Sequence, residues 1–183
     1  MLKSRLCIAF FAFAVGCAPA QKPLTDYVNA MVQVSPVTKF HSGAGYQYED
    51  SVIYGFTHTN KGHWNLCHIP LLPVTGTPTP GDYCSPFSHE RESAAPGYYQ
   101  VFLDRYGVDA QLSSTLRCAF HKYTYPAGAA PAVLADLQRS NEHVRAWDIR
   151  KEGDNVFAGW QQTGEKMYFY AVANRPVTGI EPV

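Results

Sequence analysis

Proline and glycine punctuate this chain so closely that little room is left for long helices. The 183 residues include 13 prolines and 14 glycines, and no stretch beyond residue 20 keeps a helical period of apolar residues over three turns. Aromatic residues make up 14% and charged residues only 16% of the chain, a composition typical of an all-β exported domain and not of a disordered one. We therefore predict an all-β fold, an antiparallel β-sandwich of short strands joined by turns.

Alternation of apolar and polar residues predicts where the strands lie. The pattern is clearest at 98–104 and 108–114, which we expect to form a hairpin. Because Pro70 interrupts the apolar run 66–74, we expect that run to be an edge strand. Turn residues crowd 75–96, which predicts a surface excursion. Further strands are expected at 26–34, 116–125, 132–137, 144–150, 156–161 and 166–173.

The charge balance excludes one class of partner. Lysine and arginine together number 15, as do aspartate and glutamate, so the formal net charge is zero. A protein that binds the phosphate backbone needs a basic face, so we expect no nucleic acid partner. The chain also has no glycine-rich phosphate loop.

The first twenty residues predict export. Lys3 and Arg5 precede an apolar stretch, 6–16, that is too short to span a bilayer, and Ala18-Pro19-Ala20 offers a cleavage site. We expect a signal peptide at 1–20, a single domain at 21–183, a secreted or periplasmic protein and no membrane span. The alternative is an outer-membrane lipoprotein anchored at Cys17, because residues 14–17 partly resemble a lipobox.

Three cysteines remain beyond the predicted cleavage site. An odd number cannot form a complete disulfide framework. A Cys67–Cys84 bridge and buried free thiols both stay open at this point.

One segment, 54–73, concentrates side chains that could hold a polar ligand. An indole offers a flat apolar face, and carboxamides and imidazoles offer convergent hydrogen-bonding groups. The alternative is a structural loop whose polar groups are all satisfied internally. The candidate binding residues are His58, Asn60, His63, Trp64 and Asn65.

Other chemistries find less support in the sequence. His58, His63, Cys67 and His68 lack zinc-site spacing, so we predict no metal site. Ser85, Ser88 and His89 lack the strand–turn–helix setting of a nucleophile. Glu49 and Asp136 are carboxylates by type alone, with no spacing that pairs them for glycoside cleavage, so no catalytic residue is predicted.

Several short motifs, in this order, resemble the N-terminal domain of glycoside hydrolase family 92, the bacterial calcium-dependent exo-α-mannosidases. Each motif is weak alone, but their order covers nearly the whole chain beyond the signal peptide. The motifs lie at residues 26–29, 31–36, 45–48, 53–59, 85–90, 96–99 and 120–126.

The resemblance implies a β-sandwich of the galactose-mutarotase-like kind, followed by a large helical domain. In the family, the catalytic carboxylates and most calcium ligands belong to that second domain, so Ca²⁺ is expected for the full-length enzyme and no cofactor for this chain. We expect the chain to be truncated before the helical domain, and the sandwich domain 21–183 to be incomplete at its C-terminal end. A glycine-rich family segment is also missing here, where only Ala30 separates Asn29 from Met31, which affects the N-terminal sugar contacts.

The resemblance also implies what the segment 54–73 does. It is expected to approach an α-mannoside from the sandwich side, with Trp64 stacking on the sugar and with His58, Asn60, His63 and Asn65 bonding to hydroxyls. We predict a carbohydrate-binding domain that shapes the substrate site of an exo-α-mannosidase and is inactive alone. A free-standing carbohydrate-binding module and a non-functional gene fragment are the alternatives. The sequence leaves the mannosidic linkage open.

Overall fold

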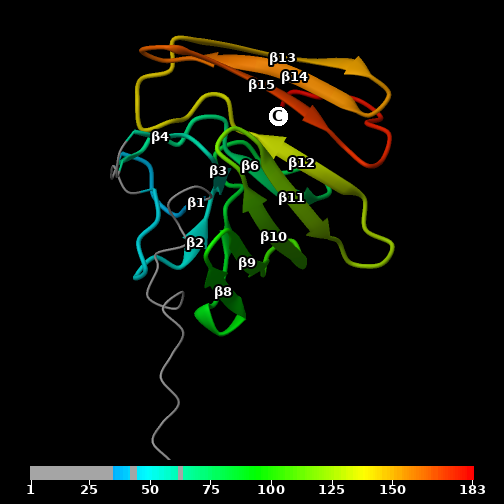
Figure 1. Ribbon diagram of the computed structural model, residues 1–183. Helices are drawn as coiled ribbons and strands as arrows, with labels where there is room; N and C mark the ends of the chain where they lie inside the picture. The colour runs from blue at the N-terminus through cyan, green and yellow to red at the C-terminus, as the bar shows by residue number, and fades with distance from the viewer. Residues whose placement is uncertain (1–34, 42–44, 62–63) are drawn as a thin grey trace, which may run out of the picture.

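The protein is all-β in the computed structural model, which describes residues 35–41, 45–61 and 64–183 (Figure 1). Within these ranges one short 3-10 helix, η3 (His89–Arg91), interrupts the strands. All strand pairs are antiparallel. The predicted fold class is therefore confirmed. The same residues contain no helix long and apolar enough to cross a membrane.

Three sheets account for most of the strands. The first has the order β1-β3-β6-β12, the second β11-β10-β9-β8 and the third β13-β14-β15. Two short pairs, β2-β7 and β4-β5, complete the set. The bounds are β1 Ser35–Val37, β2 Val52–Ile53, β3 Gly55–Thr57, β4 Asn60–Lys61, β5 Trp64–Asn65, β6 Leu71–Thr75, β7 Ser85–Pro86, β8 Glu92–Ala95, β9 Tyr98–Leu103, β10 Val108–Ser114, β11 Ala119–Thr124, β12 Pro131–Ala135, β13 Ala146–Gly153, β14 Val156–Gln162 and β15 Lys166–Val172.

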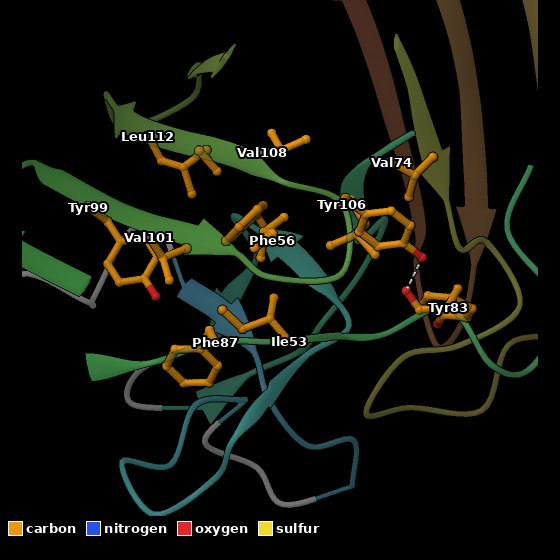
Figure 2. Packing of buried hydrophobic residues seen from close by; sticks show 13 residues of the cluster. Ile53, Phe56, Val74, Tyr83, Phe87, Tyr99, Val101, Tyr106, Val108 and Leu112 are labelled. Carbon is orange, nitrogen blue, oxygen red and sulfur yellow. Dashed lines mark hydrogen bonds between the residues drawn. The ribbon is translucent and has the colours of Figure 1, made fainter. Parts of the chain in front are cut away.

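The core forms where the first sheet meets the second. Every second residue of β9 and β10 points inward, as the alternation in the sequence predicts, and the predicted hairpin is confirmed. These side chains form one cluster with Phe56 of β3 and Val74 of β6 (Figure 2). Leu72 of β6 belongs to the same cluster. The inward residues of the hairpin are Tyr99, Val101, Leu103, Val108, Ala110 and Leu112.

The apolar run 66–74 departs from the prediction. The chain turns through Cys67 and Ile69, both at φ 52°, so that β6 begins only after Pro70. β6 then lies between β3 and β12, so the expected edge position was wrong. Pairing with β3 is limited to Leu71, which leaves Pro73 a ladder partner on one side only and makes its missing N–H tolerable. The expected strand 26–34 lies outside the described residues.

The third sheet is fastened to the rest by a buried side chain. Gln161 of β14 has no exposed surface. Its Oε1 accepts a hydrogen bond from the backbone N–H of Ile69 at 3.1 Å, and its Nε2 donates to the carbonyls of Leu137 and Arg139, each at 3.1 Å. No residue of β13, β14 or β15 belongs to the main hydrophobic cluster. The hydrogen bonds of Gln161 therefore help to hold the third sheet against the rest of the fold, whereas apolar packing holds the other two sheets together.

A partly buried polar cluster links several of the motifs that resemble the glycosidase family. The Glu92 carboxylate accepts hydrogen bonds from the hydroxyls of Tyr99, at 2.7 Å, and Tyr46, at 3.1 Å, and also contacts Nδ1 of His89. The His89 ring stacks on Tyr48, with ring centroids 4.0 Å apart. Glu92 thus joins the loop that follows Gly45 to η3 and β9.

Both ring nitrogens of His89 face groups that can only accept. Nε2 lies 2.7 Å from the carbonyl oxygen of Tyr48, and Nδ1 contacts the Glu92 carboxylate. Both nitrogens must therefore carry protons, and the hydrogen bond to Glu92 raises the pKa of His89. A raised pKa in the folded state gives stability that is fully present below the unfolded value, about 6.5, and is lost as the pH rises through the folded-state pKa.

We expect this contact to make the stability of the domain depend on pH. The difference in unfolding free energy between the wild type and His89→Gln should be largest in mildly acidic buffer and should shrink as the pH rises. Urea unfolding of both proteins at several pH values measures it. A difference that stays constant with pH would contradict the assignment of a charged His89.

Candidate functional site

The β4–β5 hairpin carries three of the five predicted binding residues. Asn60 pairs with Asn65, and Lys61 pairs with Trp64. Successive side chains of a strand point to opposite faces, and accordingly Trp64 is 54% exposed whereas Asn65 is 3% exposed. Asn60 is also exposed. The hairpin therefore presents the indole of Trp64 on one face, whereas the exposed Asn60 lies opposite Asn65. His63 lies outside the described residues.

Asn65 lies on the buried side of the hairpin and anchors it. Its Oδ1 accepts a hydrogen bond from the backbone N–H of Cys67 at 2.8 Å, and its carbonyl accepts one from Nδ2 of Asn141 at 2.6 Å. A Cβ at Gly45 would lie 2.7 Å from Nδ2 of Asn65, so only glycine fits there. The structure thus places Asn65 below the surface that Trp64 occupies.

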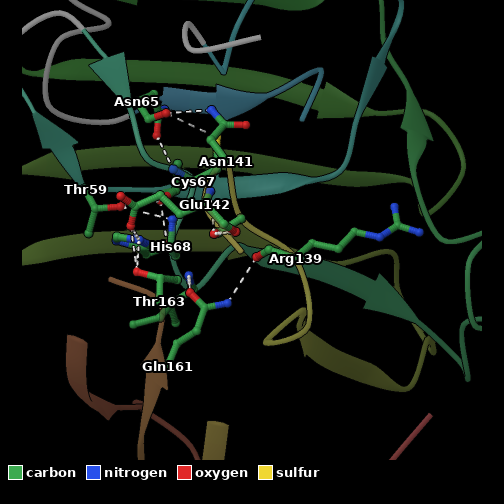
Figure 3. Close-up of polar contacts among 12 residues, drawn as sticks. Thr59, Asn65, Cys67, His68, Arg139, Asn141, Glu142, Gln161 and Thr163 are labelled. Atoms are coloured by element: carbon green, nitrogen blue, oxygen red, sulfur yellow. Dashed lines mark hydrogen bonds and ion pairs between the residues drawn. The ribbon is translucent and has the colours of Figure 1, made fainter. Parts of the chain in front are cut away.

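The turn after the hairpin is held by a second set of polar contacts around the buried His68 (Figure 3). Nε2 of His68 lies 3.1 Å from the Glu142 carboxylate and 3.2 Å from the Thr163 hydroxyl, which donates to Glu142 at 2.6 Å. The backbone N–H of His68 donates to the hydroxyl of Thr59 at 3.1 Å. Hydrogen bonding from Thr163 and His68 lowers the pKa of Glu142. These contacts fix the hairpin relative to the third sheet.

His58 follows β3 and meets a histidine from another sheet. Nε2 of His58 lies 2.5 Å from Nε2 of His121 on β11. Burial, together with the neighbouring His58, lowers the pKa of His121 to about 3, so His121 is a neutral imidazole at physiological pH. The sequence signal for His121 was its alternation with Tyr123 and Tyr125 along one strand, but alternation alone identifies a face and not a contact.

The remaining sequence candidates fall elsewhere. Asp136 accepts hydrogen bonds from the hydroxyl of Tyr83 and the backbone N–H of Gln138, and Glu49 is exposed in a turn. Cys67, Cys84 and Cys118 are free thiols, and burial raises the pKa of Cys67 to about 12. Among the residues that the structure describes, no three His, Cys, Asp or Glu side chains lie close enough to hold a metal ion. The exposed indole of Trp64 can stack on a flat apolar partner.

The fold and this surface define an antiparallel β-sandwich domain with an exposed aromatic hairpin. Residues 22–182 match the family model described as "Glycosyl hydrolase family 92 N-terminal domain". The chain belongs to this family, and the resemblance seen in the motifs is confirmed. A search of curated proteins gives no match.

Solved structures agree with the family. The family GH92 α-mannosidase BT3965 from Bacteroides thetaiotaomicron superposes with a TM-score of 0.76 at 25% identity, over 88% of this chain and 27% of that one. The same enzyme in complex with mannoimidazole gives 0.76 at 27% identity, over 86% and 26% of the two chains. The inverting mannosidase BT2199 from the same organism, at 22% identity and a TM-score of 0.60 over 76% and 23%, shows the shared fold. This chain spans about a quarter of the length of these structures.

Proposed function

We propose that this domain binds glycans and forms the sandwich side of the substrate site of a family 92 α-mannosidase, without hydrolytic activity of its own. One observation carries the proposal: the Trp64 indole stands 54% exposed on a hairpin that two buried polar networks hold in place. A fixed, solvent-facing indole is a suitable platform for the apolar face of a sugar. BT3965, which shares the fold, is an α-mannosidase whose complex with mannoimidazole has been solved.

The predicted contacts divide into two roles. We propose that Trp64 stacks on a mannose ring while Asn60 and His58 bond to its hydroxyls. His63 stays a predicted contact. Asn65 also stays a predicted contact. Its hydrogen bonds to Cys67 and Asn141 give it a second role, which is to anchor the hairpin.

We propose that cleavage of the glycosidic bond takes place in another part of the enzyme. Glycoside cleavage needs two carboxyl groups flanking one bond, and the described hairpin sets Lys61 directly opposite Trp64. Calcium prefers several carboxylate and carbonyl oxygens. We propose that the calcium of the full-length family enzyme takes its ligands outside this domain. The helical domain that follows in the family would supply both. We also propose that the segment 1–20 directs export of the protein, either in soluble form or with a lipid anchor at Cys17.

Sugar binding by residues 21–183 tests the proposal. We expect saturable NMR shifts on addition of mannose or α-mannobiose, and an affinity about fivefold weaker in Trp64→Ala, because stacking contributes roughly 1 kcal/mol. Trp147→Ala is the matched control, since Trp147 is 43% exposed on β13, outside the hairpin.

Two outcomes would contradict the proposal. One is a folded wild type that shows no shifts at high sugar concentration, or shifts that Trp64→Ala leaves unchanged. The other is turnover of an aryl α-mannoside by the purified chain, which would show that the domain is active alone.

A further inference from the structure

A line of three polar side chains leads from the interior of the second sheet to His58. The hydroxyl of Tyr123 contacts Nδ1 of His121 at 2.5 Å, and Nε2 of His121 contacts Nε2 of His58 at 2.5 Å. Tyr123 and His121 are two residues apart on β11 and share one face of it. The sequence singled out His58 alone of these three as a site residue.

Counting protons fixes the direction of the hydrogen bonds. Burial raises the pKa of Tyr123 well above its ordinary value, so its hydroxyl keeps a hydrogen to donate. Among the described residues, Nδ1 of His121 is the acceptor within reach of that hydroxyl. If Tyr123 donates there, the proton of the neutral His121 lies on Nε2 and points at Nε2 of His58. His58 then accepts at Nε2 and carries its own proton on Nδ1.

The reverse order is unfavourable. His121 would donate from Nδ1 to the Tyr123 oxygen, and the hydroxyl hydrogen of the partly buried Tyr123 would be left without an acceptor in the described part of the chain. In the described part of the chain, both side chains also contact aromatic rings. Phe56 meets the His121 ring edge-on with centroids 6.5 Å apart, and Tyr125 meets Tyr123 at 6.4 Å. The groups that titrate next to His121 are thus His58 and Tyr123, with Tyr125 beyond.

We propose that Tyr123 and His121 are positioning residues that hold His58 as a neutral imidazole protonated on Nδ1. The N–H of the His58 ring then lies on Nδ1, and the contact at Nε2 fixes its direction. That this donor serves a sugar hydroxyl rests on the proposed function, whereas the tautomer itself does not.

Nitrogen NMR of the histidine rings tests the tautomer without any ligand. In the wild type at neutral pH, Nε2 of His58 should give a pyridine-type resonance and Nδ1 a pyrrole-type one. Tyr123→Phe removes the hydroxyl hydrogen that sets the direction of the hydrogen bonds from Tyr123 through His121 to His58. Both His58 nitrogen resonances should therefore shift toward intermediate values. Tyr125→Phe is the control: it loses a hydroxyl from a nearby ring of the same sheet face, which bonds to the Ala132 carbonyl at 2.7 Å, and should keep the wild-type pattern.

The wild-type spectrum is decisive even if a variant fails to fold. A pyrrole-type Nε2 in His58 of the wild type would overturn the proposal, as would an unchanged His58 pattern in folded Tyr123→Phe. Titration with mannose separates this proposal from the proposed function. A wild type with the expected tautomer and no sugar shifts refutes only the sugar site, whereas sugar binding with the opposite tautomer refutes only the positioning role.

Discussion

Replacing Glu92 by glutamine is expected to lower the free energy of unfolding by about 3 kcal/mol. The carboxylate accepts from two tyrosine hydroxyls and contacts the His89 ring, and it does so with a side chain that is only 8% exposed. Glutamine has one acceptor oxygen and directs an amide donor at groups that also donate. At least one buried hydroxyl then loses its partner, which costs roughly 1–3 kcal/mol, and the charged hydrogen bond to His89 is lost as well.

Urea unfolding of Glu92→Gln measures this loss, and Glu90→Gln is the matched control. Glu90 lies two residues away, is exposed, and should change the stability by less than about 0.5 kcal/mol. Equal effects of the two substitutions would show that Glu92 does not hold the loop after Gly45 to β9.

Gln161→Leu is expected to destabilise the domain by about 3 kcal/mol or more, through a different part of the fold. Leucine keeps the approximate volume but leaves the N–H of Ile69 and the carbonyls of Leu137 and Arg139 without their partner. Each buried backbone group that loses its hydrogen bond costs roughly 1–3 kcal/mol when water cannot replace it. Because Gln161 links the third sheet to the others, the loss should also loosen that sheet.

Two measurements check the role of Gln161. Unfolding in urea gives the size of the effect, and limited proteolysis of the connection 136–145 reports whether the third sheet has loosened. Gln162→Leu is the control, because Gln162 is the next residue of β14, is partly exposed, and points to the opposite face. If Gln162→Leu destabilises as much as Gln161→Leu, the buried hydrogen bonds are not what fastens the sheet.

Periodicity predicted the strands best where local pattern and final burial coincide. The hairpin of β9 and β10 has one buried and one solvent-facing side along its whole length, so its alternation is visible in the sequence. The prediction of a single edge strand at 66–74 failed because Cys67 and Ile69 adopt a left-handed backbone conformation. Non-glycine residues with positive φ are uncommon, and contacts made by distant parts of the chain hold them there.

The candidate site shows the same division. The polar segment with Trp64 could be found from residue types, and the family from the order of its motifs. The sequence could not show that Asn65 is buried while its neighbour Trp64 is exposed, because that depends on which face of β5 meets Asn141 and Gly45. It also could not show that His58 lies against His121, 63 residues further along the chain.

By itself, then, the sequence determined the all-β class, most strand positions and the family, because turn residues, alternation and short motifs act over a few residues. The tertiary structure alone decided which polar side chains became anchors and which stayed on the surface. Glu92, Gln161 and His68 resemble ordinary polar residues until strands from distant parts of the chain enclose them. A buried polar group must find its partners within hydrogen-bonding distance, and those distances exist only once the sheets have packed.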